Sequence, residues 1–452
     1  MATVKRLRAF AWRASLARGV SAAVLCMLPA TVGAQDAYGP AAPATASADT
    51  AILDRPPGVT PELNRAIEQA FGGYPAIRSA KAQIRAARAD VRGAKWLSYP
   101  SVSVEGFAYA GGRKTITGDN GVTANVVVEQ PLWASGRIDG TIKRAEADKL
   151  AADAALLETA LAIAVRLSDA YYALAQSAVD AAILDEGLAE HRRLVETITR
   201  RIEQEISPRA DLDLAQSRVA QLEQRLAAAV ASRAAALQAL RELVGDQNYD
   251  PGNVPTYDAR VHHPDPAQAL EQAVTCSPTR QRLTAQALAA KANVEVVTSQ
   301  ALPQLSAQYS HNEVTGDRVG VVLRAQTSGG LSNLTAIDAA KLRRQSADLD
   351  VGVAERDLRQ SLAADLAQNE ADRQRIVEAA KAAVATRVVT ESYKRQFAAN
   401  GRSWFDVMNA VREATDAELT QADTEIDAMA TNARILLRTC RWQPTPGSAN
   451  EP

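Results

Sequence analysis

The sequence predicts a mainly α-helical fold with a small β part, in which long antiparallel helices and β-hairpins occur as a tandem repeat. Residues 138–206 read as one unbroken helix, which at about 1.5 Å per residue would be roughly 100 Å long. A second helix of this kind is predicted at 331–399. Each follows two short segments of alternating polar and apolar residues, the pattern of a β-hairpin. A helix this long cannot bury its apolar seam alone, so the fold must supply partner helices of matching length.

The first parts of the two copies correspond residue by residue. Ala66-Ile67-Glu68-Gln69-Ala70 matches Ala269-Leu270-Glu271-Gln272-Ala273, and Pro75 matches Pro278. A register without gaps over about forty residues indicates a tandem duplication. The first copy spans 61–245, with helices at 61–98, a β-hairpin at 99–133, a long helix at 138–206 and a helix at 208–245. After a linker at 246–265, the second copy spans 266–440, with helices at 266–301, a β-hairpin at 302–327, a long helix at 331–399 and a helix at 403–440, and a tail at 441–452 follows.

The shorter helices carry start signals and have informative lengths. Ser403 precedes Asp406 at the spacing of a capping box, and Ser207 is expected to cap a helix that starts at Pro208. In each copy the two shorter helices together approach the length of the long one, so we expect them to lie end to end along it. His191 falls in the apolar seam of 138–206, and we expect it and Tyr171-Tyr172 to pack between helices.

Residues 1–34 are predicted to be a secretory signal peptide, and 35–60 a flexible tail rich in Ala, Pro, Thr and Ser. Basic residues without acidic ones precede an apolar run, which ends at small residues before a cleavage point after Ala34. A lipoprotein signal at Cys26 is the alternative, although Leu25 is larger than the small residue that such a signal prefers. Export would place the mature chain outside the cytoplasm of a bacterium.

Composition and motifs exclude several classes of function. The chain has 51 Lys and Arg against 52 Asp and Glu, so it offers no basic platform for nucleic acid. No Gly-rich phosphate loop, nucleophile elbow or ligand cluster is present, so we expect neither an enzyme nor a bound cofactor or metal. His262-His263 reads as a solvated loop. Cys276 and Cys440 could form a disulfide or stay as buried thiols, and the spacing leaves both open.

No apolar run beyond the signal is long enough for a membrane-spanning helix, but β-strands can cross a membrane with about ten alternating residues. Each predicted hairpin has one apolar and one largely polar face. Four such strands cannot close on themselves, and open edges are not tolerated in lipid. If these hairpins enter a membrane, several chains must therefore combine their strands.

The chain resembles the TolC family of outer membrane efflux proteins. The resemblance rests on the order of the tandem elements, on Val128-Glu129-Gln130-Pro131-Leu132-Trp133 at the end of the first hairpin, and on Asp406-Val407-Met408-Asn409-Ala410 after the second long helix. It implies a TolC-like homotrimer, in which four strands per chain contribute to a shared twelve-stranded β-barrel in outer-membrane lipid and the helices form an α-helical barrel in the periplasm. The second hairpin departs from the family pattern, because it lacks the Gln-Pro-Leu-aromatic signature.

The resemblance also implies partners and a function. The partners are a periplasmic adaptor (membrane fusion) protein and an inner-membrane transporter. Together with them, this chain would form a tripartite export machine, in which it is the outer-membrane exit channel. Its cargo would be a protein (type I secretion) or small molecules (efflux), and Ser328-Gly329-Gly330-Leu331-Ser332 resembles the adhesin-exporting branch. The alternative is a soluble periplasmic coiled-coil scaffold or adaptor.

The candidate site implied by the resemblance is a periplasmic aperture. Members of the family carry two acidic residues three positions apart at this entrance, and the matching positions here are Asp406 and Asn409. Arg402 and Phe397 resemble gate-linking residues. With one acid fewer, a trimer would present one ring of carboxylates, so we expect weaker cation selectivity and weaker block by divalent ions. Alternatively, Asp406 is placed in the first helical turn only because the helix dipole favours an acid there.

Overall fold

A computed structural model describes residues 56–110, 120–260, 265–312, 316–325 and 332–444. All of them belong to the second of two compact units, Asp54–Pro452, which is the part considered below. The predicted signal peptide, Cys26, nearly all of the predicted tail, His262-His263 and most of the stretch around Gly329 lie outside the described residues.

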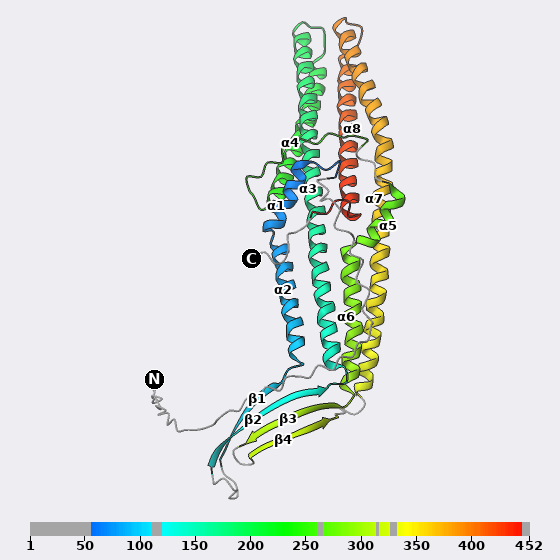
Figure 1. The fold of residues 1–452 in the computed structure, drawn as a ribbon. Coiled ribbons are helices and arrows are strands. Elements are labelled where there is room, and N and C mark those ends of the chain that lie inside the picture. Colours follow the sequence, from blue (N-terminus) through cyan, green and yellow to red (C-terminus); the bar gives the residue numbers. More distant parts are fainter. Residues whose placement is uncertain (1–55, 111–119, 261–264, 313–315, 326–331, 445–452) are drawn as a thin grey trace, which may run out of the picture. The chain divides into compact units, whose positions relative to one another are not determined.

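The described residues form long helices with one small sheet, which confirms the predicted fold class (Figure 1). The long helices α3 and α7 have 67 residues each. In chain order the elements are α1 (Pro61–Gly73), α2 (Pro75–Trp96), β1 (Ser101–Ala110), β2 (Asn120–Trp133), α3 (Arg137–Glu203), α4 (Arg209–Val244), α5 (Pro266–Cys276), α6 (Pro278–Gln300), β3 (Gln304–Asn312), β4 (Gly316–Arg324), α7 (Ser332–Ala398) and α8 (Trp404–Arg438).

The shorter helices line the long ones. Helices α2 and α4 both pack on α3, and α6 and α8 both pack on α7. Helix α3 also packs on α6 and α8 of the other copy, which the repeat by itself did not indicate. The two copies are therefore joined side by side along α3.

Proline and serine set the helix boundaries. Tyr74 separates α1 from α2 because Pro75 disfavours a helical conformation in the preceding residue, and Tyr74 is extended (ψ 129°). The expected cap of α8 is confirmed, since Ser403 Oγ accepts a hydrogen bond from the Asp406 backbone N–H (3.1 Å). The expected cap at Ser207 is wrong: α4 begins at Arg209, and Pro208 is itself extended (ψ 153°) in the capping position.

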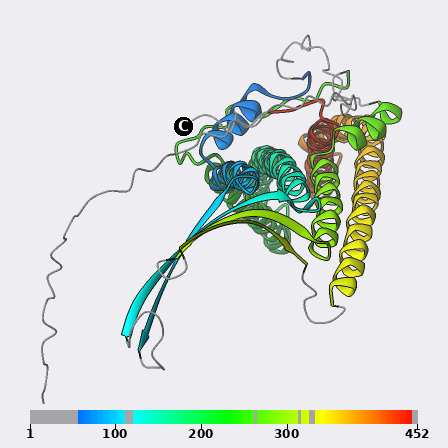
Figure 2. The ribbon, with the colours of Figure 1, turned by 60° about the horizontal axis from the view of Figure 1, so that its bottom comes forward.

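The four strands form one antiparallel sheet in the order β1-β2-β3-β4 (Figure 2). One row of facing residues crosses all four strands and is apolar: Val102, Val128, Tyr309 and Val319. The next row is Ser101, Glu129, Gln308 and Gly320, on the opposite, largely polar face. Val102 is 66% exposed and Val319 is 84% exposed. Among the described residues, the apolar face is uncovered, and no strand pairs with the outer edges of β1 and β4.

The largest core lies where α1, α2, α4 and the linker meet α3 and α8. Leu63, Ile77 and Leu167 are fully buried there. Tyr171 and Tyr172 belong to this core and His191 is buried further along α3, so all three pack between helices as expected.

Of the two alternatives for the cysteines, the structure shows the disulfide, because Cys276 and Cys440 are bonded to each other (Cα–Cα 6.3 Å). None of the helices described here is long and apolar enough to cross a membrane.

Candidate functional site

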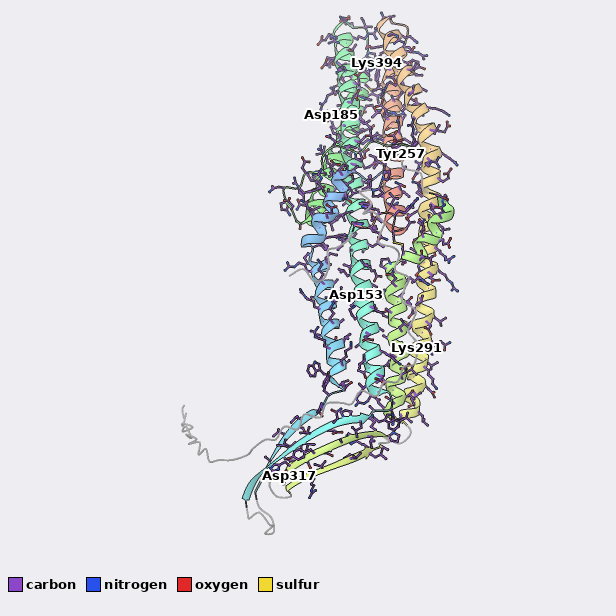
Figure 3. The ribbon with its side chains drawn as sticks, in the orientation of Figure 1. Asp153, Asp185, Tyr257, Lys291, Asp317 and Lys394 are labelled. Carbon is purple, nitrogen blue, oxygen red and sulfur yellow. A yellow bond between two sulfur atoms is a disulfide. The ribbon has the colours of Figure 1, made fainter. Side chains whose placement is uncertain are left out.

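The candidate site lies at the helical tips, at the far end of the helices from the sheet (Figure 3). Helix α3 turns into α4 between Glu203 and Arg209, and α7 turns into α8 between Ala398 and Trp404. Both turns contain a non-glycine residue with positive φ, Glu205 (61°) and Asn400 (56°). One apolar cluster, which we call the tip cluster, packs the two turns together: Leu194, Ile198, Ala215, Phe397, Trp404, Val407, Met408 and Val411.

Arg402 and Asp406 are close to each other, as a shared site requires. The Arg402 guanidinium lies 3.8 Å from Asp406 Oδ2 and donates from Nε to Gln396 Oε1 (3.2 Å). It also lies over the ring of Tyr393, 4.1 Å from the centroid. Arg402 is therefore held between α7 and the first turn of α8, while both charged side chains of the pair keep contact with solvent.

Asp406 has a structural role as well as an exposed charge. Its backbone N–H is the group that Ser403 caps, and the Ser403 hydroxyl donates to Asp406 Oδ2 (2.9 Å). An acid in the first turn of α8 is also favoured by the helix dipole. Asn409 lies one turn further along α8 and is half-buried like Asp406. The two residues are neighbours on one helix, at the spacing that the resemblance implies.

Phe397 is a packed residue of the tip cluster, only 7% exposed. The guanidinium of Arg201, at the end of α3, lies 4.7 Å from the centroid of its ring. Arg201 also donates to the side-chain amide oxygen of Asn400. Phe397 thus joins the tip of the second copy to the tip of the first through a cation–π contact and a neighbouring hydrogen bond.

Sequence reasoning missed Arg201, Asn400, Glu190 and Lys394. Lys394 on α7 lies 2.8 Å from Glu190 on α3, so an ion pair also links the copies near the tips (Figure 3). Burial disfavours the charged form of Glu190, yet the ammonium of Lys394 and the guanidinium of Arg193 outweigh it and lower the pKa of Glu190. The only signal in the sequence was the presence of charged residues near the ends of both long helices.

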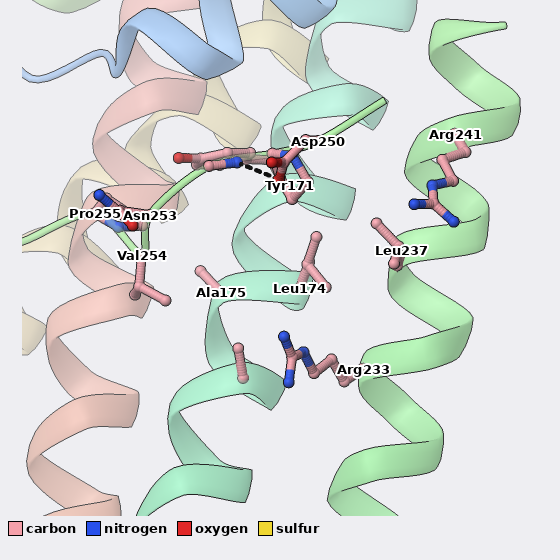
Figure 4. Close-up of a pocket in the computed structure, with 13 residues that line it drawn as sticks. Tyr171, Leu174, Ala175, Arg233, Leu237, Arg241, Asp250, Asn253, Val254 and Pro255 are labelled. Atoms are coloured by element: carbon pink, nitrogen blue, oxygen red, sulfur yellow. Dashed lines mark hydrogen bonds between the residues drawn. The ribbon is translucent and has the colours of Figure 1, made fainter. Parts of the chain in front are cut away.

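Another cavity lies beneath the linker and has a volume of about 220 Å³ (Figure 4). Arg233 and Arg241 reach it from α4, and Leu174 lines it from α3. Asp250 in the linker accepts a hydrogen bond from the Gly252 backbone N–H (3.0 Å), which shapes one wall. Among the residues that line it, no nucleophile is paired with a base. Within the described ranges, no group of three His, Cys, Asp or Glu side chains is arranged to hold a metal ion.

Comparisons with known proteins agree with this architecture. Residues 66–246 match the family model described as outer membrane efflux protein. Protein CyaE of Bordetella pertussis (strain Tohama I) is 29% identical over 270 residues, which are 57% of this chain and 56% of CyaE. The alignment thus spans little more than half the length of that relative.

Solved structures share the fold over most of the chain. The outer-membrane channel OprN has a TM-score of 0.77 at 18% identity and covers 85% of this chain and 91% of its own. The outer membrane protein VceC of Vibrio cholerae has a TM-score of 0.73 at 16% identity, with coverage of 84% and 96%. The open-state MtrE outer membrane channel of Neisseria gonorrhoeae has a TM-score of 0.69 at 16% identity, with coverage of 84% and 88%.

The fold is therefore that of channel proteins built from a four-stranded sheet and paired long helices. Residues 66–246 are similar to the outer membrane efflux protein family, and the fold over most of the chain is similar to that of solved outer-membrane channels.

Proposed function

We propose that this chain is the outer-membrane exit channel of a tripartite export machine. Three copies combine their strands into one twelve-stranded barrel in the outer membrane, and their helices form a tunnel in the periplasm. The cargo, a protein in type I secretion or a small molecule in efflux, passes from an inner-membrane transporter through a periplasmic adaptor protein into this tunnel.

The observation that carries the proposal is the sheet. Its apolar face exposes Val102, Val319, Val321 and Leu323, each more than 60% exposed, while the opposite rows are largely polar. Such a face destabilises a protein in water but is favourable against lipid tails. Two unpaired edges invite further strands, and closing a ring with neighbouring copies satisfies their backbone groups.

Membrane extraction tests this proposal against a soluble scaffold. We expect the protein to remain in the membrane fraction through high-salt washing and to require detergent for release. After reconstitution into planar bilayers it should conduct ions. Release by salt alone, as a detergent-free monomer, would instead indicate the periplasmic scaffold or adaptor.

A matched pair of variants makes this test specific for the sheet. Val321→Arg places a charge on the apolar face, where it should cost about 2–4 kcal/mol at the membrane midplane and reduce insertion. Arg318→Ala changes a charged residue in a polar row of the same strand, so insertion should be unaffected. Equal insertion of the two variants would contradict a lipid-facing apolar surface.

We also propose that Asp406, Asn409, Arg402 and Phe397 form the periplasmic aperture. The exposed Arg402–Asp406 pair and the packed Phe397 at the tips support this assignment. In single-channel recordings, Asp406→Ala should reduce cation preference and weaken block by divalent ions, because the trimer would lose its ring of three carboxylates. Asp211→Ala, in the equivalent first turn of α4, is the control and should change less. Unchanged selectivity and block in Asp406→Ala would remove Asp406 from the aperture.

The partners can be identified by crosslinking in intact cells. A tagged protein purified after crosslinking should carry an adaptor and an inner-membrane transporter. The kind of transporter recovered then decides between protein secretion and small-molecule efflux.

A further inference from the structure

An acidic groove of about 570 Å³ runs between α3 and α8, away from the helical tips. We call it the aspartate groove. Four carboxylates and one cation line it, together with a buried tyrosine and a glutamine. Its lining residues are Asp169, Tyr172, Ala173, Gln176 and Asp180 on α3, and Asp423, Ile426, Asp427, Ala430 and Arg434 on α8.

Two of the carboxylates lie close to each other across the helix pair. The Gln176 side-chain amide donates to Asp423 Oδ1 and also to Asp180 Oδ1 (3.3 Å). Asp427 follows Asp423 by one turn of α8. The glutamine therefore holds two aspartates from different helices at the same place in the groove.

The cation in the lining does not neutralise this pair. Arg434 is already bound to Asp169 (3.2 Å) on α3 and to Asp365 (3.6 Å) on α7. Beyond the lining, Arg225 is bound to Asp416 and Arg375 to Asp372. The groove thus keeps an excess of negative charge around Asp180, Asp423 and Asp427.

The electrostatics agree with this geometry. Burial and the neighbouring Asp180 carboxylate raise the pKa of Asp423 to about 6. Burial also raises the pKa of Asp180 and of Asp427. Carboxylates whose charged form is disfavoured in this way gain from any cation that enters the groove.

Tyr172 gives an independent indication of a ligand. Its side chain is only 2% exposed and lines the groove, and its hydroxyl has no hydrogen-bond partner among the described residues. A buried hydroxyl without a partner is costly, so most are satisfied by protein, water or ligand. Tyr172 thus adds a polar group with unused hydrogen-bonding capacity to the lining of the groove.

We propose that the aspartate groove binds organic cations that carry ammonium or guanidinium groups, through Asp180, Asp423 and Tyr172. An inorganic metal ion fits less well, because the described residues hold no group of three His, Cys, Asp or Glu arranged around one point. An N–H-bearing cation instead forms charge-assisted hydrogen bonds with acceptors spread along a groove. Binding of such a cation does not require that the chain form a channel.

Binding should weaken in acid, because protonation of Asp423 removes one of the charges. The charged and titratable groups that face Asp423 from neighbouring helices do not reverse this loss of affinity in acid. The cations among them are already paired with acidic side chains. These groups are Asp169, Tyr172 and Asp180 on α3, Arg225 on α4, Asp365, Asp372 and Arg375 on α7, and Asp427 and Arg434 on α8.

Titration calorimetry on the purified full chain tests the proposal with two probes. Spermidine represents a free amine, and a blocked tetralysine peptide represents basic side chains of a polypeptide. At pH 7.5 we expect saturable binding of spermidine, and binding of the peptide as well if the groove admits side chains. At pH 5, where Asp423 is mostly protonated, spermidine affinity should fall by about tenfold.

Two variants and a control locate the site. Asp423→Asn and Asp180→Asn should each weaken spermidine by about tenfold, the value of a charge-assisted hydrogen bond. Asp185→Asn removes an exposed charge from the same helix outside the groove, so affinity should change by less than about twofold (Figure 3). Circular dichroism shows that the variants are folded. Absence of spermidine binding at pH 7.5, or equal affinity of Asp423→Asn and wild type, would overturn the proposal.

Discussion

At the scale of single residues, Gly187 decides how closely α3 approaches α8. A Cβ atom at this position would lie 2.7 Å from Thr415 Oγ1 and 3.0 Å from its Cγ2. Such distances are far below van der Waals contact, so a larger residue must displace Thr415 or separate the helices. The structure thus explains a glycine in the middle of a long helix, where the helix propensity of alanine would otherwise be preferred.

Gly187→Ala should therefore lower the free energy of unfolding by about 1–3 kcal/mol, because overpacking outweighs the gain in helix propensity. Gly352→Ala is the matched control on α7, where an added Cβ meets nothing within 4 Å. It should raise the free energy of unfolding by about 0.5–1 kcal/mol. Denaturant unfolding measures both variants, and Thr415→Ala in the Gly187→Ala background should restore part of the loss. Equal effects of the two glycine substitutions would contradict the close approach.

His191, one turn beyond Gly187, should make stability depend on pH. It is 1% exposed, and its Nδ1 lies 2.8 Å from the Gly187 carbonyl oxygen. Burial lowers the pKa of His191. Arg218 and Arg412 also lower this pKa, whereas Glu190 raises it. Because the folded pKa lies below the unfolded one, the contribution is complete above about pH 6.5 and is lost as the pH falls.

Wild type should accordingly lose more unfolding free energy than His191→Gln between pH 7.5 and 5.5, by at most about 1.4 kcal/mol per pH unit. The raised pKa of Asp423 acts in the opposite direction, since its folded state takes up a proton more readily. That contribution is present in both proteins and cancels in the comparison. Parallel stability curves for the two proteins would show that His191 is not the titrating group.

At the scale of helices and strands, what the sequence predicts well is local. The alternating three-and-four spacing of apolar residues in 138–206, the prolines at the start of α2 and α6, and the cap at Ser403 each depend on residues close together in the chain, so the sequence alone reveals them. The contact of α3 with α8 and the link from Arg201 to Asn400 join residues of different copies, 199 positions apart in the latter case. Periodicity does not specify such pairs, which is why Arg201 and Lys394 were missed, whereas family resemblance is what singled out Asp406 as a candidate.

A disulfide connects two parts of the second copy that are far apart in the chain. It joins Cys276, where α5 meets α6, to Cys440 after the end of α8, across 164 residues. Closing so long a loop restricts the unfolded chain, so reduction should lower the free energy of unfolding by about 2–4 kcal/mol. Chemical unfolding with and without dithiothreitol measures this. The Cys276→Ser/Cys440→Ser double variant should resemble the reduced protein and be insensitive to the reductant; full stability without the bond would contradict the expectation.

At the scale of the whole molecule, α7 carries one seam that is buried within the chain and one apolar seam that is exposed. Residues at intervals of seven from Leu362 to Phe397 are buried against neighbouring helices. A second seam is exposed and has the seven-and-four spacing of a coiled coil: Leu342, Leu349, Val353, Val377, Val384 and Val388, each more than 50% exposed. A tube made of three copies needs such a helix at the boundary of each chain, since every helix in a closed ring has neighbours on two sides.

In the proposed trimer, the exposed seam should lie at the interface between neighbouring copies. Val384→Lys places a charge in the seam and should shift detergent-solubilised protein from trimer towards monomer, because a charge buried without a partner opposes association. Lys381→Ala, an exposed substitution about one turn away, should leave the trimer intact, since its ion pair with Glu378 is a surface contact of small value. Native mass spectrometry distinguishes the two species directly. A trimer that is equally stable in both variants would exclude this seam from the interface, and the tunnel would then have to close through a different face of α7.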